Sequence, residues 1–352
     1  MLKHLEILAK DIQVGYILDE NIYENKVLLL KQGTIITEHI KDLLKNRKHV
    51  KIIKNVVEEE NYVQEDLSDD RLVILNESVK TRIREDITHL FEDVADNNNA
   101  SLAQDISDTL VNDVLKKDGV GLNLDALKIS DEYTFKHSVD VAAAGIVLGK
   151  YLGFGEDSLR DIGTAGVLHD IGKIKIPNEI LNKNGKLTDA EFTIIKNHPV
   201  YGYQLLVDNK EISEPIRRAV LYHHEHFDGS GYPSKLQGYN IPLYARVLTV
   251  VDVFDALVTE RPYHKAYTVG DTLELMYTMT AQFDIDIFQA FLKSLIIYPI
   301  GSMLELSNGV KAQVIKSNKG YPLRPVVKDV KTGEVLDLAN DRNCLSLMIK
   351  QK

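Results

Sequence analysis

Histidine and aspartate residues gather in the central part of the chain in a pattern typical of metal ligands. His169 is followed directly by Asp170, and His223 by His224. Imidazole and carboxylate groups suit first-row divalent ions such as iron, manganese and zinc. Because Cys344 is the only cysteine, zinc sites built from several cysteines are excluded. A mixed His/Asp set fits a hydrolytic site better than a structural zinc site.

A hydrolytic centre of this kind commonly holds two ions about 3.5–4 Å apart, which clamp a phosphodiester and activate a bridging water. Such a centre needs a bridging carboxylate, and Asp170 is the natural candidate. The apolar residues 165–168 lead into the His-Asp pair, so we expect the pair to end a buried helix and to point into a helical bundle. Asp252 and Asp255 are one helical turn apart and share a face.

Other candidate residues have two interpretations when they are taken singly. A lone histidine such as His137 is more often a core residue than a ligand. Lys173, one turn after Asp170, is either a solvated lysine or a group that neutralises a phosphate oxygen. Arg261 could grip phosphate and Tyr263 could stack on a base, but the same segment also fits an ordinary charged helix exit.

The elements that must position these residues are predicted to be mainly helical. Residues 125–298 show helical patterns, with a capping box at Thr188 and Glu191 and with Pro199 and Pro215 in helix first turns. Residues 228–233 are a loop by composition. Residues 299–352 contain short strand-like runs between turn residues and predict a small β domain.

The N-terminal part predicts a small α+β domain over residues 1–60, with strands at Val27–Leu30 and Val50–Ile53 and a helix from Glu38 to Asn46. Residues 61–124 are predicted to be a linker and connecting helices. Apolar residues from Leu72 to Val94 recur every three or four positions and indicate one long helix. Its apolar stripe fits packing against the next domain, or a coiled coil in a homodimer. A second helix is expected from Ser101 to Lys116.

Composition narrows the class of protein. The 352 residues carry a net charge of −10, which argues against broad binding of DNA or other nucleic acids. No run approaches the roughly 18 apolar residues of a membrane span, and the N-terminus lacks the apolar core of a signal peptide. We therefore expect a cytoplasmic protein without a membrane span.

Several separated motifs, taken together and in order, closely resemble the HD-GYP family, a branch of the HD phosphohydrolase superfamily. The resemblance runs from about Tyr133 to Lys265. The matching segments are His169–Lys173, Lys183–Thr188, His198–Pro199, His223–Glu225, Asp228–Pro233 and Asp252–Leu257.

The resemblance implies an α-helical domain that hydrolyses cyclic di-GMP to linear pGpG, and in some members on to GMP, by in-line attack of a hydroxide that bridges two ions. Catalytic roles fall to Asp170 as the bridging ligand and to Lys173 on the phosphate. One ion would be held by His137, His169, Asp170 and Asp252, and the second by Asp170, His198, His223 and His224. Arg261, Tyr263, His264 and Lys265 would bind the ligand with Lys173, and the loop Gly231, Tyr232 and Pro233 would shape the rim or offer a partner surface.

Three departures from the family pattern qualify this transfer. Some members carry a glutamate where this chain has Tyr133, as part of a three-metal site, so two ions are favoured here. His226 and His264 stand at positions that are usually basic, which could weaken ligand affinity or change its pH dependence.

The competing hypotheses are a hydrolase of another cyclic dinucleotide or nucleotide, and a sensor or interaction module that does not cleave its ligand. Candidate partners are cyclic di-GMP, a second copy of the chain, and a GGDEF-type diguanylate cyclase or another signalling protein.

Overall fold

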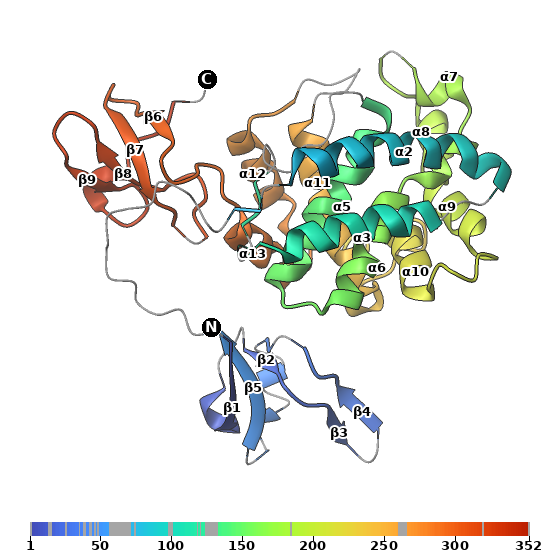
Figure 1. The fold of residues 1–352 in the computed structure, drawn as a ribbon, viewed down its shortest axis with the longest axis horizontal. Helices are drawn as coiled ribbons and strands as arrows, with labels where there is room; N and C mark the ends of the chain where they lie inside the picture. Colours follow the sequence, from blue (N-terminus) through green and yellow to red (C-terminus); the bar gives the residue numbers. More distant parts are fainter. Residues whose placement is uncertain are drawn as a thin grey trace. The chain divides into compact units, whose positions relative to one another are not determined.

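The structure is a computed structural model, and it divides the chain into two compact units (Figure 1). One unit comprises residues 1–66 with residues 152–154, and the other comprises the rest. The predicted domain boundaries at residues 60, 124 and 298 stay predictions. The structure describes residues 2–12, 16–24, 27–34, 36–37, 40–41, 44–45, 47, 49–55, 72–73, 75–97, 101–117, 119, 121–123, 133–183, 185–259, 266–318 and 320–350.

The first unit is built from short antiparallel strands. β5 (His49–Asn55) pairs with both β1 (Leu2–Leu8) and β2 (Ile17–Leu18), while β3 (Ile22–Glu24) and β4 (Val27–Leu30) form a separate pair. The strands expected at 27–30 and 50–53 are therefore confirmed. Part of the helix expected from 38 to 46 lies outside the described residues; of the rest, residues 40, 41 and 44 are helical.

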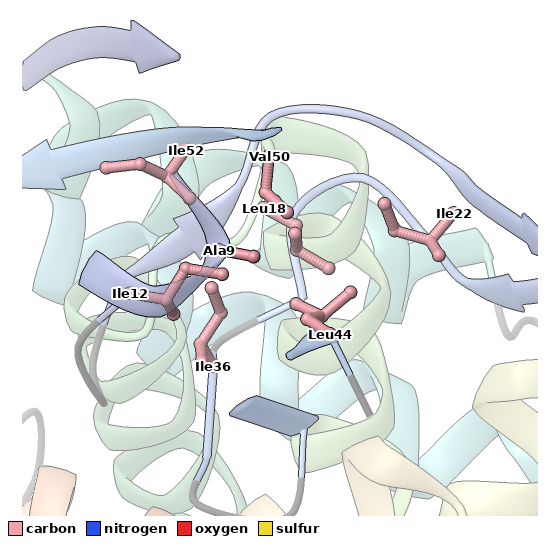
Figure 2. Close-up of a cluster of buried hydrophobic side chains, with 8 residues drawn as sticks. All are labelled: Ala9, Ile12, Leu18, Ile22, Ile36, Leu44, Val50 and Ile52. Atoms are coloured by element: carbon pink, nitrogen blue, oxygen red, sulfur yellow. The ribbon is translucent and has the colours of Figure 1, made fainter. Parts of the chain in front are cut away.

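Apolar side chains from these strands and their connections form the core of this unit. Figure 2 shows eight of them converging, from strands β2, β3 and β5 and from the segments between them. Burial of such side chains supplies the stabilisation that short strands cannot provide by pairing alone. The cluster consists of Ala9, Ile12, Leu18, Ile22, Ile36, Leu44, Val50 and Ile52.

Two helices of the predicted connecting region pack on the bundle of the second unit. α2 (Glu77–Asn97) packs against α3 (Ser101–Leu115), and α3 packs against α6 (Glu156–Leu168). Ile83, Ile87 and Leu90 of the α2 stripe are buried within the single chain. This burial favours the interpretation of the stripe as a packing face, and the homodimer stays a prediction.

Helices α5 (Tyr133–Tyr151), α6 and α11 (Leu243–Val258) pack together in the second unit. Between α6 and α11 the chain forms a 3-10 helix η2 (Ile171–Lys175) and helices α7 (Asn178–Leu181), α8 (Asp189–Ile195), α9 (His198–Leu206) and α10 (Glu214–Tyr222). Helices α12 (Val269–Thr278) and α13 (Ile285–Ser294) follow. The predicted fold, a mainly helical bundle of the HD type with small strand-containing regions at both ends, is confirmed.

Local sequence signals explain where several of these helices begin. The Thr188 side chain accepts a hydrogen bond from the backbone of Glu191, whose carboxylate accepts one from the Thr188 backbone, so the predicted capping box starts α8. Pro199 and Pro215 lie in the first turns of α9 and α10, where a missing N–H costs nothing.

The C-terminal strands form one antiparallel sheet in sequence order, β6 (Met303–Glu305), β7 (Lys311–Lys316), β8 (Val326–Asp329) and β9 (Val335–Asp337). It has its own buried cluster, which includes Leu306, Val314 and Val327. No helix among the described residues is long and apolar enough to cross a membrane.

Candidate metal centre

Three buried histidines of the bundle share one local arrangement. The Nδ1 atom of each lies at hydrogen-bond distance from the backbone carbonyl three residues earlier: His169 to Gly166 at 2.7 Å, His198 to Ile195 at 2.8 Å, and His223 to Val220 at 2.8 Å. A carbonyl can only accept, so Nδ1 carries the proton in each ring. In the neutral form of each ring, Nε2 then carries the lone pair, and these Nε2 atoms lie close to one another.

These lone pairs converge on Asp170. Nε2 of His198 is 3.2 Å from Asp170 Oδ1 and 3.3 Å from Nε2 of His223, and Nε2 of His169 is 3.4 Å from Asp170 Oδ2. Yet neither His169 Nε2 nor Asp170 Oδ1 has a partner in good hydrogen-bond geometry, although both atoms are buried. Buried acceptors that face one another without donors are costly unless a cation lies among them.

A second group of contacts surrounds His137 on α5. Its Nε2 is 2.8 Å from Asp252 Oδ1, and its Nδ1 is 2.6 Å from Asp255 Oδ2. Asp252 Oδ1 also lies 3.9 Å from His169 Nε2, and Asp252 Oδ2 lies 3.9 Å from His224 Nδ1. Asp252 therefore joins the two groups, while Asp255 orients the imidazole of His137 from behind.

The charge states of these groups suit the binding of cations. Burial by itself would raise the pKa of Asp170, but Lys173 and His169 outweigh it and hold that pKa well below its usual range. Burial and then the neighbouring imidazoles hold the pKa of His223 well below its usual value. Burial lowers the pKa of His224 to about 3. The site thus combines an ionised carboxylate with neutral imidazoles, the protonation states that metal ligands require.

His137 is the exception to this pattern. Burial would lower its pKa, but the carboxylates of Asp252 and Asp255 outweigh burial and raise it to about 10. The imidazolium here supplies the positive charge between two buried carboxylates, which a metal ion at Nε2 would supply instead. Metal binding at this position would therefore release a proton.

The ligand atoms lie close enough to hold ions in overlapping groups. Asp170, His198, His223 and His224 form one group, and His137, His169 and Asp170 form another, within each of which the candidate atoms are all within 4.8 Å of one another. His169 and His223 with Asp252 form a third group. All seven residues expected as metal ligands are thus brought together, and Asp170 belongs to both of the first two groups.

Lys173 lies at the edge of this cluster and not free in solvent. Its Nζ donates to Asp170 Oδ2 at 2.5 Å, and its side chain is about one-third exposed, at 31%. η2 is held close to α9 because Gly172 has no side chain: a Cβ atom there would lie 2.0 Å from the carbonyl oxygen of His198. The glycine between Asp170 and Lys173 therefore allows the two ligand-bearing segments to approach.

The loop Gly231, Tyr232 and Pro233 lies against the cluster. The Tyr232 ring stacks on the His224 ring, with centroids 4.8 Å apart and planes at 29°. Burial, and then Asp252 and Asp170, raise the pKa of Tyr232, so its hydroxyl stays protonated as a donor near the two carboxylates. A Cβ atom on Gly231 would lie 2.3 Å from the His226 backbone nitrogen, so this close return of the loop requires glycine.

The same loop is anchored by a residue to which the sequence motifs assigned no role. Glu225 is buried, and its two carboxylate oxygens accept from the backbone nitrogens of Ser234 at 2.6 Å and Leu236 at 3.0 Å. Asp255 is the other residue that was not assigned a role. Its signal was the spacing of three from Asp252, which places both side chains on one face of α11.

Four residues expected to bind the substrate, Arg261, Tyr263, His264 and Lys265, lie outside the described residues. His226 is described: its Nδ1 is 2.8 Å from Ser230 Oγ within the loop, and burial lowers its pKa. The histidine at this usually basic position is therefore engaged within its own loop.

The helical part of the chain is similar to known proteins. Residues 122–287 match the family model described as an HD domain. The chain is 40% identical to a cyclic di-GMP phosphodiesterase of Pseudomonas aeruginosa over 64% of this chain and 55% of that protein. It is 46% identical to the cyclic di-GMP phosphodiesterase response regulator RpfG of Xanthomonas campestris over 38% of this chain and 35% of that protein.

A further relative is a 3'3'-cGAMP-specific phosphodiesterase of Vibrio cholerae, 36% identical over 41% of this chain and 33% of that protein. The matches thus span between a third and just over half of these relatives' own lengths. The helical bundle is an HD domain. The resemblance of the chain to the HD-GYP family, which the sequence motifs predicted, is confirmed.

Proposed function

We propose that this protein is a metal-dependent phosphodiesterase that hydrolyses cyclic di-GMP to linear pGpG at a centre of two divalent ions. The observation that carries the proposal is the shared orientation of His169, His198 and His223. In each ring, Nδ1 donates a hydrogen bond to the backbone carbonyl three residues earlier. The three Nε2 atoms therefore face one another and the buried carboxylate of Asp170. Without ions, this arrangement would bury polar acceptors that have no donors, which costs folding free energy.

The proposed ligand sets follow the groups of neighbouring atoms. His137, His169, Asp170 and Asp252 would hold one ion, and Asp170, His198, His223 and His224 the other. Asp170 would bridge them because its two oxygens face different histidines, Oδ1 toward His198 and Oδ2 toward His169. Mixed nitrogen and oxygen ligands favour iron or manganese over zinc for phosphodiester chemistry.

When bound, the two ions supply an activated water and neutralise charge on the phosphate. The chain's own residues orient the reactants around them. Lys173 places an ammonium beside the shared carboxylate, where it can donate to a phosphate oxygen as negative charge develops. Tyr232 offers a protonated hydroxyl near the carboxylates of Asp252 and Asp170, and its ring stacks on His224.

The choice of cyclic di-GMP as substrate is supported by the relatives named for that activity. The segment from Arg261 to Lys265 is proposed to bind the ligand, with the loop Gly231, Tyr232 and Pro233 at the rim. A second candidate substrate is 3'3'-cGAMP, which the Vibrio cholerae relative is named for. A non-catalytic sensor is disfavoured because all seven proposed ligands are present and lie together.

The test is direct. Protein purified without oxygen and loaded with manganese or iron is mixed with cyclic di-GMP, 3'3'-cGAMP and a panel of ordinary nucleotides, and products are separated by chromatography. We expect pGpG from cyclic di-GMP, and its loss in His169→Ala. Faster cleavage of 3'3'-cGAMP would favour the second substrate. Intact cyclic dinucleotides in the presence of a full metal complement would contradict the proposed activity.

A further inference from the structure

Lys196 lies near the proposed centre and has no carboxylate partner among the described residues. Its side chain is half-buried at the end of α8, two residues before His198. Two other lysines of this region are paired, Lys173 with Asp170 and Lys183 with Glu191. Among the residues that the structure describes, no carboxylate forms an ion pair with Lys196. A partly desolvated ammonium without a counter-charge favours the approach of an anion.

The surroundings of Lys196 link it to the proposed metal centre. Its Nζ lies 4.6 Å from the centroid of the Phe192 ring and 5.4 Å from that of the Tyr232 ring. Tyr232 in turn stacks on His224, one of the proposed ligands. The ammonium is therefore held one ring beyond the cluster, against the loop that contains Tyr232, by two aromatic contacts that restrict its position.

A cyclic dinucleotide carries two phosphodiesters in one ring, so a ligand that places one phosphate at the metal centre holds its second negative charge a short, fixed distance away. We propose that Lys196 binds this second phosphate and thereby selects ligands with two phosphates over those with one. The assignment rests on the proposed function of the same site. Lys173, whose Nζ donates to Asp170, is assigned to the phosphate at the metal centre.

A structural role is the alternative. A lysine at the C-terminal end of a helix interacts favourably with the last carbonyl groups, and its contact with Tyr232 could simply support the loop. The two roles differ in what they do to a substrate with one phosphate. A support for the loop affects every substrate that uses the centre, whereas a second phosphate site affects only ligands with two phosphates.

The experiment compares the metal-loaded wild type with Lys196→Met, Lys196→Arg and Lys210→Met. Lys210 is exposed between α9 and α10, so its variant has the same change in net charge without the proposed contact. Each protein is assayed with cyclic di-GMP and with bis(p-nitrophenyl) phosphate, a diester with a single phosphate. The dissociation constant of cyclic di-GMP is measured by calorimetry on the same four proteins.

We expect Lys196→Met to raise KM for cyclic di-GMP roughly 10- to 100-fold, the effect of losing one hydrogen bond between charged groups. Its turnover of bis(p-nitrophenyl) phosphate should stay at the wild-type rate. Lys196→Arg should keep most of the affinity, and Lys210→Met should match the wild type. An unchanged KM in Lys196→Met, or equal losses on both substrates, would overturn the assignment.

Failure of the proposed function would be distinguishable from failure of this inference. A wild type that cleaves bis(p-nitrophenyl) phosphate but not cyclic di-GMP, or that cleaves neither, contradicts the proposed activity. The binding measurement then decides the role of Lys196. Weaker binding of cyclic di-GMP by Lys196→Met than by Lys210→Met supports the proposed phosphate contact of Lys196. Equal dissociation constants, or no binding by the wild type, overturn it.

Discussion

Asp255 accepts a hydrogen bond from Nδ1 of His137 at 2.6 Å, from a position one helical turn beyond Asp252, which lies 2.8 Å from Nε2 of the same ring. The imidazole is thereby fixed from both sides. A carboxylate behind a ligating histidine sets its tautomer and orientation and increases its basicity. Asp255 is for this reason expected to act on the metal centre through His137, without touching an ion itself.

Replacement of Asp255 tests this arrangement. Asp255→Asn keeps the shape but removes the negative charge behind His137, so we expect the affinity for manganese or iron to fall about 10- to 100-fold. Competition with a chromogenic chelator measures that affinity. Asp208→Asn, on an exposed residue after α9, serves as the matched control and should bind metal as the wild type does. Equal affinities in the two variants would contradict the role of Asp255.

Asp170→Asn tests the bridging carboxylate. An amide offers one oxygen where the carboxylate offers two, and its nitrogen would face a lone pair of the surrounding histidines. We expect turnover of cyclic di-GMP to be abolished and the number of bound ions, measured by elemental analysis, to fall below that of the wild type. Circular dichroism should show an unchanged helical content. Turnover at the wild-type rate would remove the bridging role of Asp170.

Gly172→Ala tests the close approach of η2 to α9. The added methyl group would lie 2.0 Å from the His198 carbonyl oxygen and 2.4 Å from the Gly202 backbone nitrogen, and neither backbone group can move freely. Overpacking of this kind costs about 1–3 kcal/mol of unfolding free energy, which urea denaturation measures.

Gly145→Ala is the control for that variant. Its added methyl group would meet nothing nearer than 3.5 Å, and its site lies inside helix α5. Alanine is favoured over glycine in a helix interior by roughly 0.5–1 kcal/mol. We therefore expect Gly145→Ala to be neutral or stabilising, and a loss as large as that of Gly172→Ala would refute the steric explanation.

The capping box of α8 should be sensitive to acid. Lys183, with the backbone and hydroxyl of Thr188, lowers the pKa of Glu191 from 4.5 to about 2. Because the pKa is lowered in the folded state, its contribution to stability is complete above pH 4.5 and is lost as the pH falls toward 2. The difference in unfolding free energy between the wild type and Glu191→Gln should shrink over this range. A difference that does not change with pH would contradict the ion pair.

The sequence already indicated much of the site because ligand chemistry depends on residue type. Only a few kinds of side chain bind divalent ions, so His169-Asp170 and His223-His224 could be recognised as candidate ligands from the sequence alone. The start of α8 was also predictable, since the capping box at Thr188 and Glu191 involves residues three positions apart. Such signals are local and survive without tertiary contacts.

Contacts between distant segments could not be predicted in this way. Gly172 appeared only as one residue of a motif, whereas the structure shows that its missing side chain admits the His198 backbone. No sequence signal distinguished Lys196 from other lysines, and only the fold shows that its ammonium lies over the Tyr232 ring. The amphipathic stripe of α2 fitted packing against the next domain or a coiled coil in a homodimer, and the burial of Ile83 and Leu90 within one chain favours the bundle.

In the sequence by itself, periodicity indicated the helical class, residue types indicated a metal site, and the order of the motifs indicated the family resemblance that implied the candidate ligands. Only the tertiary structure decided which nitrogen of each imidazole faces the centre, which carboxylate lies behind His137, and which aromatic rings Lys196 contacts. These depend on side-chain directions set by packing between segments far apart in sequence. Side-chain directions therefore cannot be predicted from the spacing of residues along the chain.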